Sequence, residues 1–138
     1  MGRPRAKTLL RLCGTVLPAL AASAAWAVWL GWDQHRDVHP DGTTTGPYQA
    51  WQVAGLVLTL LATVCWAAWR HHAVGAVLGT TAGLTVAAYA DWSDDSSGLF
   101  VIGVGLVMLG SLVGALIVAA VTCAFHPYDG SAPGLKPR

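Results

Sequence analysis

The chain has 138 residues, of which 54% are hydrophobic and only 11% are charged. A soluble domain usually carries about 25% charged residues, so this composition excludes an ordinary cytosolic domain and a disordered chain. The net charge of +1 is small, and with so few charged residues it argues against binding of nucleic acid. The length suits a single domain.

Four apolar segments are long enough, or nearly so, to cross a bilayer core about 30 Å thick as helices. They cover residues 9–31, 48–69, 73–90 and 98–125. These runs are too long for strands, and they lack the period-two alternation that strands show. The sequence therefore predicts an all-α membrane protein, in which residues 9–125 form a bundle of four transmembrane helices between a basic N-terminus (1–8) and a tail (126–138).

The first segment has a competing interpretation as a signal peptide. Residues 1–27 have a basic start, an apolar middle and small residues at 22–25, which is the pattern of a cleavable leader. The apolar run continues from Trp26 to Trp32, past any such cleavage site. We therefore expect an uncleaved first helix.

Basic residues predict the orientation, because Lys and Arg in short connections favour the cytoplasmic side. Seven of them lie before the first span, between the second and third, and in the tail: Arg3, Arg5, Lys7, Arg11, Arg70, Lys136 and Arg138. The other connections hold one basic residue, Arg36, and six acids: Asp33, Asp37, Asp41, Asp91, Asp94 and Asp95. This distribution predicts a multi-pass plasma-membrane protein with both termini in the cytoplasm.

Aromatic residues gather at the expected outer boundary. They are Trp29, Trp32, Tyr48, Trp51, Tyr89 and Trp92. Amphipathic rings favour the headgroup level of a bilayer. We therefore interpret these residues as anchors at the ends of the spans.

Glycines at helical spacing mark the third and fourth spans. One face of the third carries Gly75, Gly79 and Gly83, and one face of the fourth carries Gly103, Gly110 and Gly114. Small residues four apart let helix backbones approach closely in a membrane. Because only residues 91–97 connect these spans, the pattern predicts an antiparallel hairpin packed glycine to glycine. The alternative is that the stripe faces a second copy of the chain.

The first external loop alternates acids and histidines at every second position: Asp33, His35, Asp37, His39 and Asp41. In an extended segment such residues project to one side, and this mixed set of oxygen and nitrogen ligands suits Zn²⁺ or another divalent cation. The alternative is a solvated loop that holds no metal.

The middles of the spans hold no ionisable side chain. Ion-coupled transport usually leaves a carboxylate or a base within the membrane, and haem needs axial ligands such as histidine. We therefore expect no cofactor, no catalytic residue and no enzymatic activity.

Two stretches carry a resemblance: residues 46–53, at the start of the second span, and residues 94–103, at the start of the fourth. Together with the basic N-terminus and four spans, they resemble small uncharacterised integral membrane proteins of actinobacteria such as streptomycetes. The resemblance implies a four-span fold and a membrane location, and it implies no activity.

The leading functional hypothesis is a small non-enzymatic membrane protein that serves as an accessory or interaction subunit. Its partners would be the lipid bilayer and either another membrane protein or a second copy of itself. Two alternatives stay open. One is a homo-oligomeric transporter or channel for ions or small molecules, and the other is a membrane metal-binding protein that uses the Asp/His loop.

Overall fold

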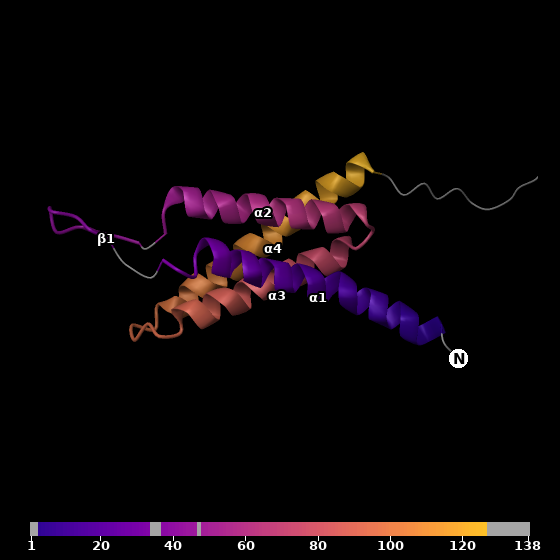
Figure 1. The fold of residues 1–138 in the computed structure, drawn as a ribbon, viewed down its shortest axis with the longest axis horizontal. Coiled ribbons are helices and arrows are strands. Elements are labelled where there is room, and N and C mark those ends of the chain that lie inside the picture. Colours follow the sequence, from indigo (N-terminus) through magenta and orange to yellow (C-terminus); the bar gives the residue numbers. More distant parts are fainter. Residues whose placement is uncertain (1–2, 34–36, 47, 127–138) are drawn as a thin grey trace, which may run out of the picture.

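The computed structural model describes residues 3–33, 37–46 and 48–126. It contains four helices, α1 (Arg3–Trp29), α2 (Ala50–Trp69), α3 (Ala73–Trp92) and α4 (Phe100–Phe125), shown in Figure 1. The connection between α1 and α2 adds two short antiparallel strands, β1 (Asp37–Val38) and β2 (Thr44–Thr45). All four helices are long and apolar enough to cross a membrane. The expected four-helix architecture is confirmed, and it marks a multi-pass membrane protein.

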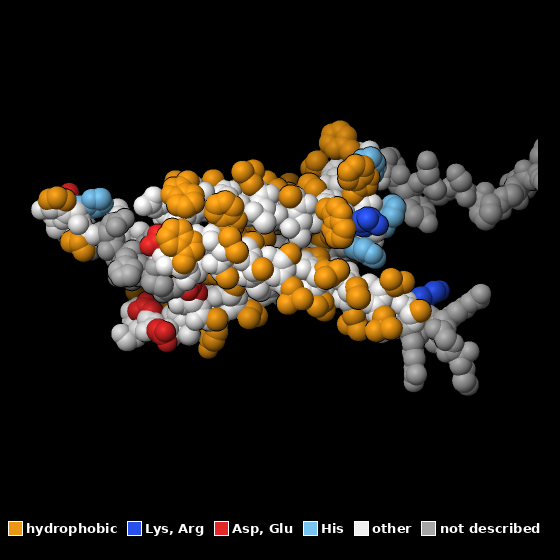
Figure 2. All heavy atoms as spheres, in the orientation of Figure 1, with side chains coloured by type: hydrophobic (Ala, Val, Ile, Leu, Met, Phe, Trp, Pro, Cys, Tyr) orange, Lys and Arg blue, Asp and Glu red, His pale blue; other side chains and the backbone are white. Residues whose placement is uncertain are grey.

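The charged side chains divide between the two ends of the bundle (Figure 2). Asp33, Asp91, Asp94 and Asp95 lie where α1 and α3 end and where α2 and α4 begin, and we call this the acidic end. Lys7, Arg11 and Arg70 lie toward the opposite, basic end. Among the side chains that the structure describes, none at the acidic end belongs to Lys or Arg.

The glycine stripe of α3 packs against α1. A Cβ atom added at any of its three glycines would collide with a backbone carbonyl oxygen of α1. The contacts pair Gly75 with Gly14, Gly79 with Thr15, and Gly83 with Ala19. Residue numbers rise together in these pairs, so the two helices run parallel. Ser23 adds a hydrogen bond, because its hydroxyl donates to the Gly83 carbonyl at 3.1 Å.

Pro18 gives this contact a second physical basis. Proline has no backbone N–H, so the carbonyl four residues earlier in a helix loses its usual donor. In α1 that carbonyl belongs to Gly14. It is the group that faces Gly75, where an added Cβ would lie 2.5 Å from its oxygen. Because Gly75 has no side chain, the Gly14 carbonyl, which lacks its usual donor within α1, can lie directly against α3.

The structure does not pair the glycines of α3 with those of α4, contrary to the sequence-based expectation. Gly103 faces the ring of Trp92, and a Cβ added at Gly110 or Gly114 would meet no atom within 4 Å. The reason is that the small residues of α1, and the Gly14 carbonyl that lacks its usual donor, lie opposite the glycines of α3. The close helix contact is thereby made between α1 and α3.

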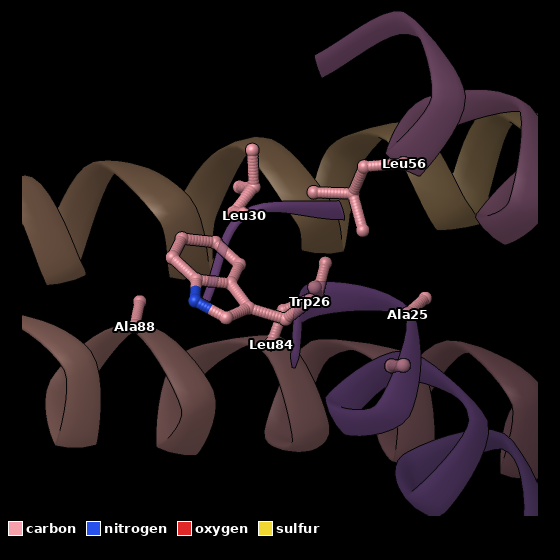
Figure 3. Close-up of a cluster of buried hydrophobic side chains, with 7 residues drawn as sticks. Ala25, Trp26, Leu30, Leu56, Leu84 and Ala88 are labelled. Atoms are coloured by element: carbon pink, nitrogen blue, oxygen red, sulfur yellow. The ribbon is translucent and has the colours of Figure 1, made fainter. Parts of the chain in front are cut away.

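Two buried clusters show how α4 joins the bundle. The first lies toward the acidic end and consists of Ala22, Ala25, Trp26, Leu30, Leu56, Leu84 and Ala88 (Figure 3). The second lies toward the basic end and consists of Val64, Ala67, Ala68, Ala76, Val77, Ala115 and Ala119. Buried residues of α4 occur only in the second cluster. Helix α4 therefore contributes buried residues toward the basic end, whereas toward the acidic end its Val104 and Val107 are only partly buried.

Candidate functional site

Four side chains from three parts of the chain form an aromatic–acid cluster at the acidic end: Trp26, Tyr48, Asp91 and Trp92. The Tyr48 hydroxyl donates to Oδ2 of Asp91 at 2.6 Å, and the indole N–H of Trp26 donates to the same oxygen at 3.3 Å. The indole N–H of Trp92 donates to the Tyr48 hydroxyl at 2.9 Å. The cluster thus connects α1, the segment before α2, and α3.

The rings of this cluster meet edge to face. The Trp26 ring lies 6.2 Å from that of Tyr48 and 5.6 Å from that of Trp92, with interplanar angles of 76° and 69°. Such arrangements are favoured because the positive edge of one ring meets the negative face of the next. The cluster is therefore held by ring packing as well as by hydrogen bonds.

Tyr48 stays protonated over a wide pH range. Burial and the hydrogen bond to the Asp91 carboxylate together raise its pKa to about 12, against the opposing effect of the Trp92 donor. The cause is that a phenolate would lose water and face a negative charge. The hydroxyl therefore remains a donor to Asp91.

Gln52 forms a second polar contact at the same end. Its side chain is fully buried, its amide nitrogen donates to Oδ2 of Asp33 at 3.1 Å, and its carbonyl oxygen accepts from the Gln49 N–H at 2.6 Å. The latter is one arm of a capping box, in which a side chain three residues into the helix reaches back to the N-cap backbone. Gln52 therefore both starts α2 and joins it to the chain after α1.

A cavity of about 480 Å³ lies between α2 and α4, and we call it the α2–α4 groove. Its walls are apolar and include Leu56 and Leu60 of α2 and Val107, Gly110 and Gly114 of α4. At the acidic end Trp26, Tyr48 and Trp92 also line the groove. Several lining residues are exposed on the outer surface, including Val57 and Leu106, so the groove opens sideways between the helices.

One polar group in the groove wall has no partner. Thr80 is 2% exposed and lines the groove, and its hydroxyl makes no hydrogen bond. Membrane threonines commonly bond to a carbonyl of their own helix. Among the described residues five others do so: Thr15, Thr59, Thr63, Thr85 and Thr122. The groove therefore contains one hydroxyl that is available to an occupant.

The metal hypothesis concerns five residues that the structure covers only in part. His35 and the side chain of Asp37 lie outside the described residues. The other three are engaged with neighbours: Asp33 with Gln52, His39 with Thr45, and Asp41 with Thr43. In the part of the chain that is described, no three His, Cys, Asp or Glu side chains are grouped so that they could hold a metal ion. The metal site stays a prediction.

The loop turns between its two strands. Asp37 pairs with Thr45 and Val38 with Thr44, and Gly42 takes a positive φ of 82° at the turn. Asp41 accepts hydrogen bonds from the hydroxyl and N–H of Thr43 at 2.6 and 3.0 Å, and the hydroxyl bond is the main cause that lowers the pKa of this exposed carboxyl. Of the described alternating residues, Asp37 therefore lies in a strand, whereas His39 and Asp41 lie at the turn.

Sequence reasoning missed the aromatic–acid cluster. It interpreted Trp29, Tyr48 and Trp92 as boundary anchors, but Tyr48 and Trp92 hydrogen-bond within the protein. The ring of Trp29 covers Gly55, and its indole N–H donates to Thr59 at 3.1 Å. The available signal was Asp91 directly before Trp92, because a carboxylate at the end of a span offers an acceptor to aromatic donors.

Comparison with known protein families, curated proteins and solved structures finds no match to this chain.

Proposed function

We propose that this protein is a small non-enzymatic plasma-membrane protein that acts as an accessory or interaction subunit, and that α4 is the helix on which a partner docks. Within the chain only Ala115 and Ala119 of this helix are buried. The other three spans are covered to a much greater extent by their neighbours. The observation that carries the proposal is this uncovered, strongly apolar helix.

Gly105 of α4 supports the same assignment. It has open space where a Cβ atom would lie and does not line the α2–α4 groove, whereas Gly75, Gly79 and Gly83 of α3 pack against α1. In a bilayer, helices associate mainly through close packing at small residues. Helix α4 thus offers a small-residue position that no other part of the described chain uses.

Site-specific photo-crosslinking in cells tests this proposal. A photoreactive residue at Leu109 or Val113 of α4 should yield a discrete adduct with one membrane protein. The matched control is Val86 of α3, which is similarly exposed and apolar and should yield only lipid adducts. Equal, diffuse labelling from all three positions would contradict the proposal.

The identity of the adduct separates the accessory role from the channel alternative. A different protein in the adduct, co-purifying in mild detergent, supports an accessory subunit. A second copy of the chain, combined with ion flux in liposomes, would instead support the homo-oligomeric channel or transporter and overturn the accessory role.

A further inference from the structure

We propose that the α2–α4 groove binds one aliphatic chain of a bilayer lipid whose zwitterionic headgroup carries an amine, as phosphatidylethanolamine does. This inference goes beyond the proposed docking of a protein on α4 and does not depend on it. It rests on the size of the groove, the chemistry of its walls, and the charge at its acidic end.

The length of the groove fits a lipid chain. The lining residues of α2 run from Val53 to Val64, which at 1.5 Å per residue is a length of about 16 Å. That length is close to half of a hydrocarbon core about 30 Å thick.

The walls of the groove match an aliphatic chain. Most of the lining residues are Val, Leu, Ala or Gly. Gly110 and Gly114 widen the groove, because neither places a side chain in it. In a membrane-spanning protein an opening between two helices at this depth admits hydrocarbon, since water is absent there. A single lipid chain can therefore enter sideways from the bilayer.

The acidic end selects the headgroup. Trp26, Tyr48 and Trp92 line that end of the groove, and aromatic faces attract ammonium groups, most strongly where they are shielded from water. Asp91 lies within the same cluster, and Asp33, Asp94 and Asp95 lie at the same end of the bundle. This charge attracts an amine and repels an anionic lipid such as phosphatidylglycerol.

Lipid retention by the purified full-length chain tests the proposal. Protein in mild detergent is mixed with equal amounts of phosphatidylethanolamine and phosphatidylglycerol that carry identical acyl chains, and bound lipids are counted by native mass spectrometry. We expect binding to saturate at one phosphatidylethanolamine per chain. Equal retention of both lipids, or binding without saturation, would overturn the proposal.

Two glycine substitutions provide a matched pair. Gly110→Leu places a side chain in the groove and should reduce lipid retention at least about tenfold, a change that corresponds to about 1.4 kcal/mol. Gly105→Leu also enters open space, but Gly105 does not line the groove, so retention should be unchanged. Equal retention by the two variants would show that the lipid binds elsewhere.

The variant Thr80→Val tests whether the occupant of the groove is a lipid chain or a ligand that places a polar group there. An aliphatic chain makes no hydrogen bond with the Thr80 hydroxyl, so this variant should retain phosphatidylethanolamine as the unmodified protein does. Loss of retention in this variant would overturn the assignment to a lipid chain. The experiment uses the isolated chain, so its failure would leave the crosslinking result on α4 unaffected.

Discussion

Tyr48 is the residue at which the hydrogen bonds of the acidic end meet. It donates to Asp91 and accepts from Trp92, so one hydroxyl connects the segment before α2 with the end of α3. Hydrogen bonds to a charged acceptor contribute more to stability than neutral ones, and a partner left unsatisfied is costly. Loss of the Tyr48 hydroxyl should therefore lower the stability of this end.

Replacement of Tyr48 by Phe should lower the free energy of unfolding by about 1–2 kcal/mol, because the ring stays and the two hydrogen bonds are lost. Thermal unfolding in detergent at pH 8 measures this change. Tyr89→Phe is the control, since Tyr89 is 56% exposed and packs edge to face on Phe100. Equal stabilities of the two variants would contradict a role for the Tyr48 hydroxyl.

The raised pKa of Tyr48 predicts that the free energy of unfolding depends on pH. Its folded pKa of about 12 lies above the ordinary value of about 10 for tyrosine. A raised pKa means that the stabilisation is complete below about pH 10 and is lost as the pH rises toward 12. The difference in stability between the native chain and Tyr48→Phe should therefore shrink across this window. A constant difference from pH 8 to pH 11 would exclude this linkage.

The alternating loop makes a second prediction at the residue scale. If its acids and histidines bind a metal, protein purified without an affinity tag should retain one equivalent of Zn²⁺ or Cu²⁺ at pH 7.5 and lose it at pH 5, because histidine ligands gain protons below about pH 6.5. Elemental analysis measures the retained metal. With no metal site, the double substitution His35→Ala and His39→Ala should change stability by less than about 0.5 kcal/mol.

At the scale of elements, the contact between α1 and α3 is the closest in the bundle. Its glycines face backbone carbonyls, and a backbone atom cannot move aside as the end of a flexible side chain can. Gly79→Leu should therefore lower the free energy of unfolding by about 3 kcal/mol or more, at or above the upper end of the usual range for overpacked cores. Gly105→Leu should be tolerated, because a Cβ there meets open space.

Gly79→Ala keeps this test informative if the Leu variant fails to fold. Even one methyl group at this position would collide with the Thr15 carbonyl, so the Ala variant should unfold at a lower temperature than the native chain in the same detergent. Unchanged melting of Gly79→Ala would show that α1 and α3 can separate there without loss of stability.

The helices could be predicted from the sequence, whereas their contacts could not. Bilayer thickness sets the length of a span, so long apolar runs identify the spans directly. The faces that pack are harder to find, because lipid-facing and buried side chains are equally apolar. The stripe of Gly75, Gly79 and Gly83 indicated a close contact, and only the structure shows that α1 makes it. Nor could the sequence distinguish Tyr48 and Trp92, which hydrogen-bond within the protein, from boundary anchors.

At the scale of the whole molecule, the distribution of charge and the position of the groove both distinguish the two ends of the bundle. The acids gather at one end of the bundle and the described Lys and Arg side chains lie toward the other (Figure 2). The groove between α2 and α4 reaches the acidic end, while α4 is held by buried residues toward the basic end. If basic connections remain in the cytoplasm, the groove faces the outer leaflet, and the proposed lipid enters from there.

The orientation is therefore the prediction on which the cellular role of both α4 and the groove depends. Single cysteines at Thr45 and at His126, in a chain whose Cys13, Cys65 and Cys123 are replaced by Ser, place one label at each end of the bundle. A membrane-impermeant maleimide should label Thr45→Cys on intact cells and His126→Cys only after lysis, because the excess of basic residues retains the second end in the cytoplasm. The reverse pattern would place the groove in the cytoplasmic leaflet. Labelling of both positions on intact cells would show that the chain inserts in two orientations.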